Sequence, residues 1–212
     1  MERRLSLSDQ TNRLIYETGI LNHRETKTSS GKSSPYYFEF STILRYPKQL
    51  QRLARILGRK IEDDGIEYDC IAPVPFSPVP IATALSLETT KPLIIPRESK
   101  DHGNQSAIEG PHKPGERALV VEDVLSTGAS ARKIISLLEK QGLIVRDIVT
   151  LVDRDEGGTE LFQKMGYTTH SLTHVMNTLQ FGYWRKPREI TYESFNAALD
   201  FYQEMRDRLV NL

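Results

Sequence analysis

Residues 118–131 read Ala118-Leu119-Val120-Val121-Glu122-Asp123-Val124-Leu125-Ser126-Thr127-Gly128-Ala129-Ser130-Ala131. An apolar run comes first, two adjacent carboxylates follow it, and a turn of small and hydroxyl-bearing residues comes next. From 130 to 141 the apolar side chains fall on one face of a helix, which ends before Gly142. We therefore predict a buried strand at 117–121, a turn, and an amphipathic helix at 130–141.

The same alternation of strands and helices continues on both sides of this stretch. Further strands are predicted at 69–74, 92–95, 148–152 and 167–174, and further helices at 47–61, 81–86 and 159–164. Alternation of this kind indicates an α/β protein whose parallel strands are joined by right-handed crossovers, with helices on both faces of the sheet. In such sheets the ligand lies at the carboxyl ends of the strands.

The two ends of the chain are predicted to add smaller elements. Ser8 or Asp9 can cap a short first helix that ends at Gly19, residues 26–35 have loop composition, and residues 36–40 have strand composition. From residue 191 onward the apolar spacing predicts a helix that packs on the domain or on a partner chain. The sequence shows no repeat of fixed period, so we expect a single domain spanning 1–212.

Charge and composition exclude several classes of protein. The chain has 28 Lys and Arg against 28 Asp and Glu, and this zero net charge argues against a nucleic-acid partner. Its hydrophobic share of 38% and charged share of 26% are those of a folded chain, not a disordered one. Cys70 is the single cysteine, which excludes an intrachain disulfide and a multi-cysteine metal site.

The sequence also predicts no membrane partner. No apolar segment follows the N-terminal residues, so a signal peptide is not expected. The longest uncharged window, 70–87, contains four prolines that forbid a continuous membrane helix: Pro73, Pro75, Pro78 and Pro80. We expect a cytoplasmic protein.

The turn after the acidic pair has the chemistry of a phosphate site. Ser126, Thr127 and Ser130 offer hydroxyl donors, Gly128 allows close approach of the backbone, and a helix N-terminus offers free N–H groups. The adjacent carboxylates would repel a phosphate unless they bind ribose hydroxyls or a magnesium ion carried by the ligand. The combination therefore predicts a phosphorylated sugar.

The run from Val121 to Gly128 resembles the phosphoribosyl-pyrophosphate (PRPP) signature of type I phosphoribosyltransferases. Three further segments are similar to orotate phosphoribosyltransferases: 100–110 to their mobile catalytic loop, 151–158 to their orotate-recognition motif, and 30–38 to the segment that closes over the base. The similarity extends from about residue 19 to about residue 179. It implies a type I fold with a small N-terminal hood at about 1–45, a core at about 46–179, and a C-terminal extension at about 180–212.

This resemblance implies a reaction and its partners. Phosphoribose would pass from PRPP to N1 of orotate, giving orotidine 5′-monophosphate and pyrophosphate in de novo pyrimidine (UMP) biosynthesis, with Mg²⁺ as cofactor. A homodimer is implied, in which the loop carrying Lys100 and His102 reaches the neighbouring site.

It also implies roles for individual residues. The catalytic residues would be Lys100, His102 and Asp123, with the magnesium carried by PRPP near Asp123. PRPP would be bound by Arg97, Glu122, Asp123, Val124, Leu125, Ser126, Thr127, Gly128, Ala129 and Ser130. Orotate would be bound by Tyr37, Phe38, Ser126 and Arg154, since a guanidinium can pair with the base carboxylate through two parallel hydrogen bonds.

Simpler structural roles are open for several of these residues. His102 could be a solvated loop histidine, and Arg154, between Asp153 and Asp155, could form a surface ion pair of little energetic consequence. Tyr37 and Phe38 could be ordinary core aromatics of a strand.

Three departures from the family pattern leave an alternative function open. Ser29 stands where a lysine is usual, Pro96 replaces a basic residue before the mobile loop, and Pro73 begins the pyrophosphate loop in place of glycine. Each change removes charge or a donor where pyrophosphate should be neutralised. The alternatives are transfer to another base, or a non-catalytic PRPP- or nucleotide-binding paralogue that acts as a sensor or regulator.

Overall fold

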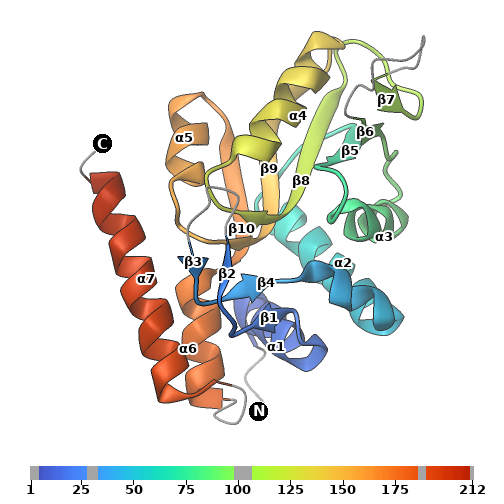
Figure 1. The fold of residues 1–212 in the computed structure, drawn as a ribbon. Coiled ribbons are helices and arrows are strands. Elements are labelled where there is room, and N and C mark those ends of the chain that lie inside the picture. The colour runs from blue at the N-terminus through green and yellow to red at the C-terminus, as the bar shows by residue number, and fades with distance from the viewer. Residues whose placement is uncertain (1–4, 28–32, 98–106, 186–189, 211–212) are drawn as a thin grey trace.

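A four-stranded parallel sheet forms the centre of the protein (Figure 1). The computed structural model describes residues 5–27, 33–97, 107–185 and 190–210. The strands are β5 (Cys70–Pro73), β8 (Arg117–Leu125), β9 (Ile144–Asp153) and β10 (Thr168–His174), in the order β10-β9-β8-β5. All neighbouring pairs are parallel, as the alternating sequence pattern predicts.

Helices cover both faces of this sheet because the strand residues are apolar on both sides. In β8, Ala118 and Val120 pack in the cluster formed with α4 (Ala129–Lys140) and α5 (Gly158–Lys164). Leu119 and Val121 point to the other face and belong to the cluster of α1, α2 and α3. These three helices are α1 (Leu7–Thr18), α2 (Pro47–Asp63) and α3 (Val79–Thr89).

Two of the core strands are longer than predicted, which moves the acidic pair into the sheet. We expected a strand at 117–121, but β8 continues through Leu125 because its pairing with β9 extends to that residue. Glu122 lies opposite Thr150, and Leu125 lies opposite Asp153. The carboxylates therefore project from the part of β8 that extends beyond β5 and is paired with β9.

The N-terminal segment forms small antiparallel pairs below the sheet (Figure 1). β1 (Leu21–Asn22) pairs with β4 (Tyr37–Phe38), and β2 (Thr26–Lys27) pairs with β3 (Ser33–Ser34). The prediction of a plain loop at 26–35 was therefore wrong in part. The predicted strand at 36–40 shortens to two residues, because the chain turns into the 3₁₀ helix η1 (Phe40–Arg45).

The predicted strand at 92–95 is divided between two partners. Leu93 forms an isolated parallel bridge with Ile71, which extends the edge of the main sheet. The next residues form β6 (Ile95–Pro96), which pairs antiparallel with β7 (Ile108–Glu109).

Two helices end the chain, and only the second was predicted. α6 (Val175–Arg185) follows β10 directly, and α7 (Tyr192–Val210) lies beside it (Figure 1). Tyr183 of α6 stacks on Phe195 of α7 with ring centroids 4.7 Å apart. Among the described residues, no helix has both the length and the apolar character needed to cross a membrane.

The N-cap of the first helix lies earlier in the chain than predicted. Ser6, rather than Ser8 or Asp9, is its N-cap, and its hydroxyl accepts a hydrogen bond from the backbone N–H of Asp9. Ser8 instead hydrogen-bonds Thr173 Oγ1 at 2.9 Å. The first helix is thereby joined to β10.

Candidate active site

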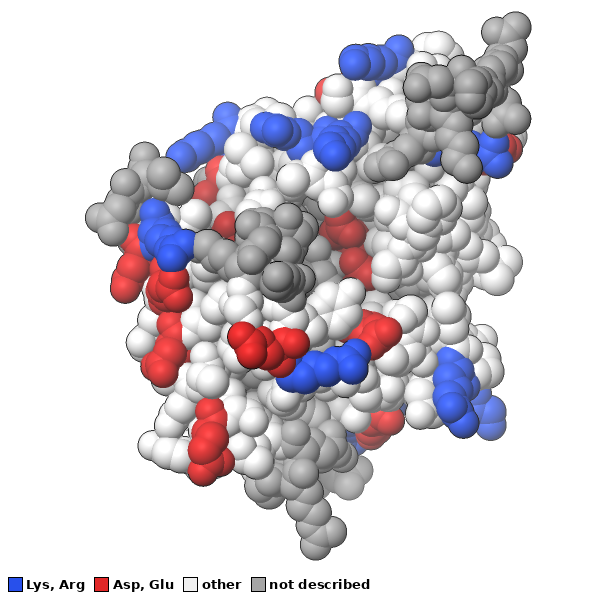
Figure 2. All heavy atoms as spheres, viewed as in Figure 1, with Lys and Arg blue, Asp and Glu red and all other residues white. Residues whose placement is uncertain are grey.

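A cavity of about 510 Å³ lies where β8 ends and the N-terminal strands cover the sheet. Its lining includes residues of both predicted halves of the site: Tyr37, Phe38, Asp123, Val124, Ser126, Thr127 and Arg154. Figure 2 shows Asp and Glu side chains at the centre of this face, whereas Lys and Arg side chains gather at its upper part, over α4. The charge that cancels in the composition is thus sorted by position.

Asp123 is the carboxylate of the acidic pair that faces the cavity. It is 9% exposed, its Oδ1 accepts the backbone N–H of Val124 at 2.8 Å, and its Oδ2 accepts a hydrogen bond from the Ser77 hydroxyl. Ser77 lies just before α3, in the predicted pyrophosphate loop, and it also lines the cavity. The two loops are therefore joined at the carboxylate.

Glu122 is buried behind Asp123 and does not line the cavity. In the described part of the chain, no Lys or Arg pairs with it. Burial, and next the neighbouring Asp123 charge, raise the pKa of Glu122 well above 4.5. Folding therefore makes the charged form of Glu122 costly, and the Asp123 backbone N–H, which donates to Glu122 Oε1 at 3.3 Å, offsets only part of that cost.

Replacing this buried carboxyl should stabilise the protein. A carboxyl whose pKa rises on folding binds its proton more tightly in the folded chain, so stability falls as the pH rises from about 4.5 toward the raised pKa. We expect Glu122→Gln to melt at a higher temperature than wild type at pH 7, with the difference shrinking as the pH falls to 4.5. Glu62→Gln, on an exposed face of α2, is the control. Equal melting temperatures of Glu122→Gln and wild type at pH 7 would contradict this expectation.

The turn after β8 is shaped by two glycines from different segments. Gly128 adopts φ +77°, and a Cβ there would lie 2.8 Å from Phe162 Cε2. Gly158 donates its N–H to the Ser126 carbonyl at 2.8 Å, and a Cβ on it would lie 2.5 Å from that oxygen. Gly128 is the N-cap of α4, and within the described residues no side-chain hydrogen bond caps this helix. The turn is therefore held by its contacts with Gly158 and Phe162.

Arg154 also lines the cavity and is 7% exposed. Its Nη2 lies 2.7 Å from Glu156 Oε1 and donates to Ser34 Oγ at 3.2 Å, and its guanidinium carbon lies 4.8 Å from the Tyr36 ring centroid. The simpler interpretation of Arg154 as a surface ion pair is therefore wrong. Its buried Nε has no hydrogen-bond partner among the described residues, so a ligand acceptor would satisfy it.

The remaining predicted residues divide into two groups. Lys100 and His102 lie outside the described residues, as does Ser29. Arg97, Leu125, Gly128, Ala129 and Ser130 are described but do not line the cavity. Arg97 instead pairs with Glu109, with Nη1 and Oε1 2.7 Å apart. Ser130 lies at a smaller neighbouring pocket beside Phe76 and Lys133.

Sequence reasoning missed four residues that complete the site: Ser34, Tyr36, Ser77 and Glu156. All four lie within segments that already resemble the family motifs, at 30–38, 73–77 and 151–158. Their types alone carry no signal, because serine, tyrosine and glutamate are common at surfaces and strand ends. Position within a motif was the one available indication.

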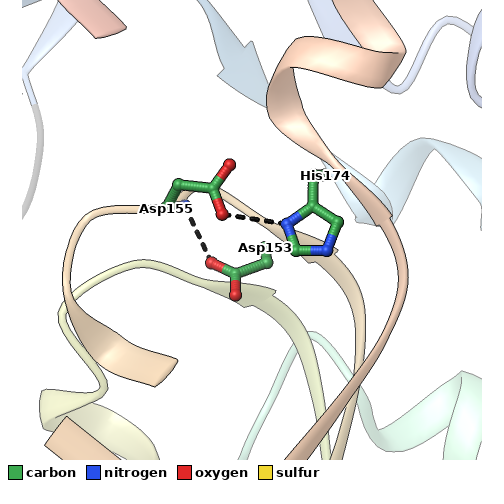
Figure 3. Close-up of side chains that lie close together, drawn as sticks. All are labelled: Asp153, Asp155 and His174. Atoms are coloured by element: carbon green, nitrogen blue, oxygen red, sulfur yellow. Dashed lines mark hydrogen bonds and ion pairs between the residues drawn. The ribbon is translucent and has the colours of Figure 1, made fainter. Parts of the chain in front are cut away.

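A second polar cluster is formed by Asp153 and Asp155, which flank Arg154 in the sequence, together with His174 (Figure 3). Asp153 accepts the N–H of Asp155 at 2.8 Å and the hydroxyl of Thr159 at 2.6 Å. His174 Nδ1 lies 2.9 Å from Asp155 Oδ1, and this hydrogen bond raises the pKa of His174 above 6.5. Because these groups bond to one another and to the loop, we interpret the cluster as support for the 154–158 turn.

Comparison with known families places the chain among the phosphoribosyltransferases. A family model described as "Phosphoribosyl transferase domain" matches residues 39–181. The orotate phosphoribosyltransferase of Pyrococcus furiosus is 38% identical over 170 residues, which cover 80% of this chain and 93% of that protein. The uridine 5′-monophosphate synthase of Bos taurus is 35% identical over 191 residues, which cover 90% of this chain and 39% of that longer protein.

Solved structures agree with these relatives. Leishmania donovani UMP synthase superimposes with a TM-score of 0.84 at 31% identity, covering 93% of this chain and 42% of that one. Orotate phosphoribosyltransferase from Aeropyrum pernix superimposes with a TM-score of 0.74 at 29% identity, covering 82% of this chain and 98% of that one. The predicted fold class is confirmed.

Proposed function

The chain belongs to the orotate phosphoribosyltransferases, and from that membership we propose that it transfers phosphoribose from PRPP to N1 of orotate. The products are orotidine 5′-monophosphate and pyrophosphate, in pyrimidine biosynthesis. One observation carries the proposal: a single cavity is lined by the carboxylate of Asp123, by the turn at Ser126 and Thr127, and by Arg154. A phosphorylated sugar and an anionic base thus have complementary groups in the same cavity.

The sugar phosphate would occupy the β8 side of the cavity. Asp123 would accept hydrogen bonds from the ribose hydroxyls. Glu122, which is buried behind it and accepts the Asp123 backbone N–H at 3.3 Å, would shape this wall and reach the ribose only if the wall rearranged on binding. The hydroxyls of Ser126 and Thr127 and the N–H groups at the start of α4 would bind the 5′-phosphate.

Orotate would occupy the side formed by the hood and the 154–156 segment. Its carboxylate would pair with Arg154 and satisfy the Nε that has no partner in the described residues. Tyr37 is 43% exposed and Phe38 is 5% exposed, and both line the cavity, so their rings would lie against the flat base.

The reaction breaks the bond from the anomeric carbon to the pyrophosphate oxygen and forms a bond from that carbon to N1 of orotate, whose proton is released. Positive charge develops on the ribose ring while negative charge grows on pyrophosphate. Asp123 would stabilise the positive charge on the ribose ring. The resemblance to the family assigns neutralisation of the pyrophosphate leaving group to Lys100 and His102. The oxygen donors at this wall suit Mg²⁺, which would supply further charge neutralisation to pyrophosphate when bound.

The proposal includes a cytoplasmic homodimer, with Lys100 and His102 serving the neighbouring site. Mixing the Lys100→Ala variant with a variant impaired at Asp123 tests this arrangement, because a mixed dimer would regain one intact site. Activity that exceeds the sum of the two separate variants is the expected result, and simple additivity would contradict shared sites.

An absorbance assay tests the transfer itself. Purified protein should consume orotate only when PRPP and Mg²⁺ are both present, with release of pyrophosphate in equal amount. Turnover of uracil or hypoxanthine without turnover of orotate would replace the base in the proposal. Calorimetric binding of PRPP without turnover of any base would identify a sensor or regulator instead.

A further inference from the structure

The C-terminal helix α7 lies outside the part of the chain that the family model matches, yet it packs against the base side of the cavity. The family model ends at residue 181, whereas α7 spans Tyr192–Val210. Figure 1 shows α7 along the edge of the molecule, beside α6 and with its C-terminal end near α5. Three of its side chains contact the surroundings of Arg154.

The first contact is made through the ring of Tyr36. Phe201 of α7 is 8% exposed and meets Tyr36 edge to face, with ring centroids 5.8 Å apart and an interplanar angle of 88°. The Tyr36 ring also meets Phe38, with centroids 6.0 Å apart, and the Arg154 guanidinium, 4.8 Å from the ring centroid. Tyr36 is 1% exposed, so its ring cannot turn without displacing these neighbours.

The second and third contacts hold the backbone that carries Arg154. Arg206 Nη1 pairs with Glu160 Oε1 at 2.8 Å and lies 3.4 Å from the carbonyl oxygen of Asp155. A Cβ on Gly157 would lie 2.7 Å from Leu209 Cδ2, so the Leu209 side chain packs directly against this turn. Asp155 adopts φ +54°, which is unfavourable for a non-glycine residue, and Gly157 adopts φ +97°, which glycine allows; α7 contacts both positions through Arg206 and Leu209.

We propose that α7 is a positioning element for base recognition, in which Phe201, Arg206 and Leu209 hold the Arg154 guanidinium in the orientation that meets the base carboxylate. These three side chains lie on one side of the helix, at roughly 3.6 residues per turn. None of them lines the cavity, so they act through Tyr36 and the 154–157 backbone rather than by touching substrate. This inference rests on the proposed function, because it assigns orotate to Arg154.

The test separates the two substrates. Phe201→Ala should raise the KM for orotate about tenfold, a size typical of coupling within one packed network, while the KM for PRPP changes less than twofold. Arg206→Ala should act in the same direction with a smaller effect, and Phe201→Leu should recover most of the loss. The controls are Gln203→Ala and Arg208→Ala; both residues are exposed on α7, and Arg208 pairs with Glu204 inside the helix.

A double-mutant cycle shows whether the effect passes through Arg154. In an Arg154→Met background, Phe201→Ala should change kcat/KM for orotate less than twofold, because the group that it positions is absent. A role limited to stability would lower the melting temperature, leave both KM values unchanged, and overturn the proposal. Arg206→Ala keeps the test decisive if Phe201→Ala folds poorly, since Arg206 is only partly buried. Absence of orotate turnover in the wild type would instead refute the proposed function.

Discussion

Asp123→Asn should lower kcat/KM for PRPP by about 10²–10⁴-fold, because it removes the charge of the carboxylate that faces the cavity. A hydrogen bond to a charged group contributes about 1.5–3 kcal/mol, and a ribose offers two hydroxyls to this carboxylate. The loss should be larger in the transition state, where the ribose ring gains positive charge. Steady-state kinetics with PRPP varied at saturating orotate, together with PRPP calorimetry, would measure it.

The Asn variant keeps the shape of the side chain, so its folded structure should be close to that of the wild type. One oxygen remains to accept the Val124 N–H, and the Ser77 hydroxyl can turn to accept from the new amide. Asp63→Asn, at the exposed end of α2, is the matched control and should keep wild-type kinetics. A kcat/KM for Asp123→Asn within threefold of wild type would remove Asp123 from the proposed machinery.

Arg154→Met should raise the KM for orotate about 10²-fold or more while the KM for PRPP stays within about threefold. Methionine has a similar length but no donors, so the base carboxylate loses its partner. Arg154→Lys should lie between the two, because lysine keeps the charge but not the planar fork. The measurement is the KM of each substrate, determined with the other substrate saturating.

The same variant should also lose stability, and this effect can be separated from binding. Removing Arg154 leaves Glu156, whose side chain is 6% exposed, as a buried acid without its partner, at a cost of about 3–5 kcal/mol. Adding Glu156→Gln should recover most of that loss without restoring orotate affinity. If the double variant regained both, Arg154 would be a structural residue, and base recognition would have to be assigned elsewhere.

Much of the fold followed from local patterns. The apolar runs that became β5, β8, β9 and β10, and the helical spacing of α2 and α4, are properties of neighbouring residues, which burial on a sheet or helix face dictates directly. α6 was missed because it begins at the residue after β10, without a turn signal between them. The length of β8 was underestimated because carboxylates look like the end of a strand when their partners in β9 are unknown.

The sequence by itself determined the order of strands and helices and the sugar-phosphate motif at 121–128, because each of these depends on residues that are close along the chain. Only the tertiary structure decided which distant residues meet. Arg154 bonds Ser34 across 120 positions, Ser77 bonds Asp123 across 46, and Phe201 packs on Tyr36. Such contacts depend on how helices and strands pack into one core, where a buried charge must find its partner wherever the chain brings one.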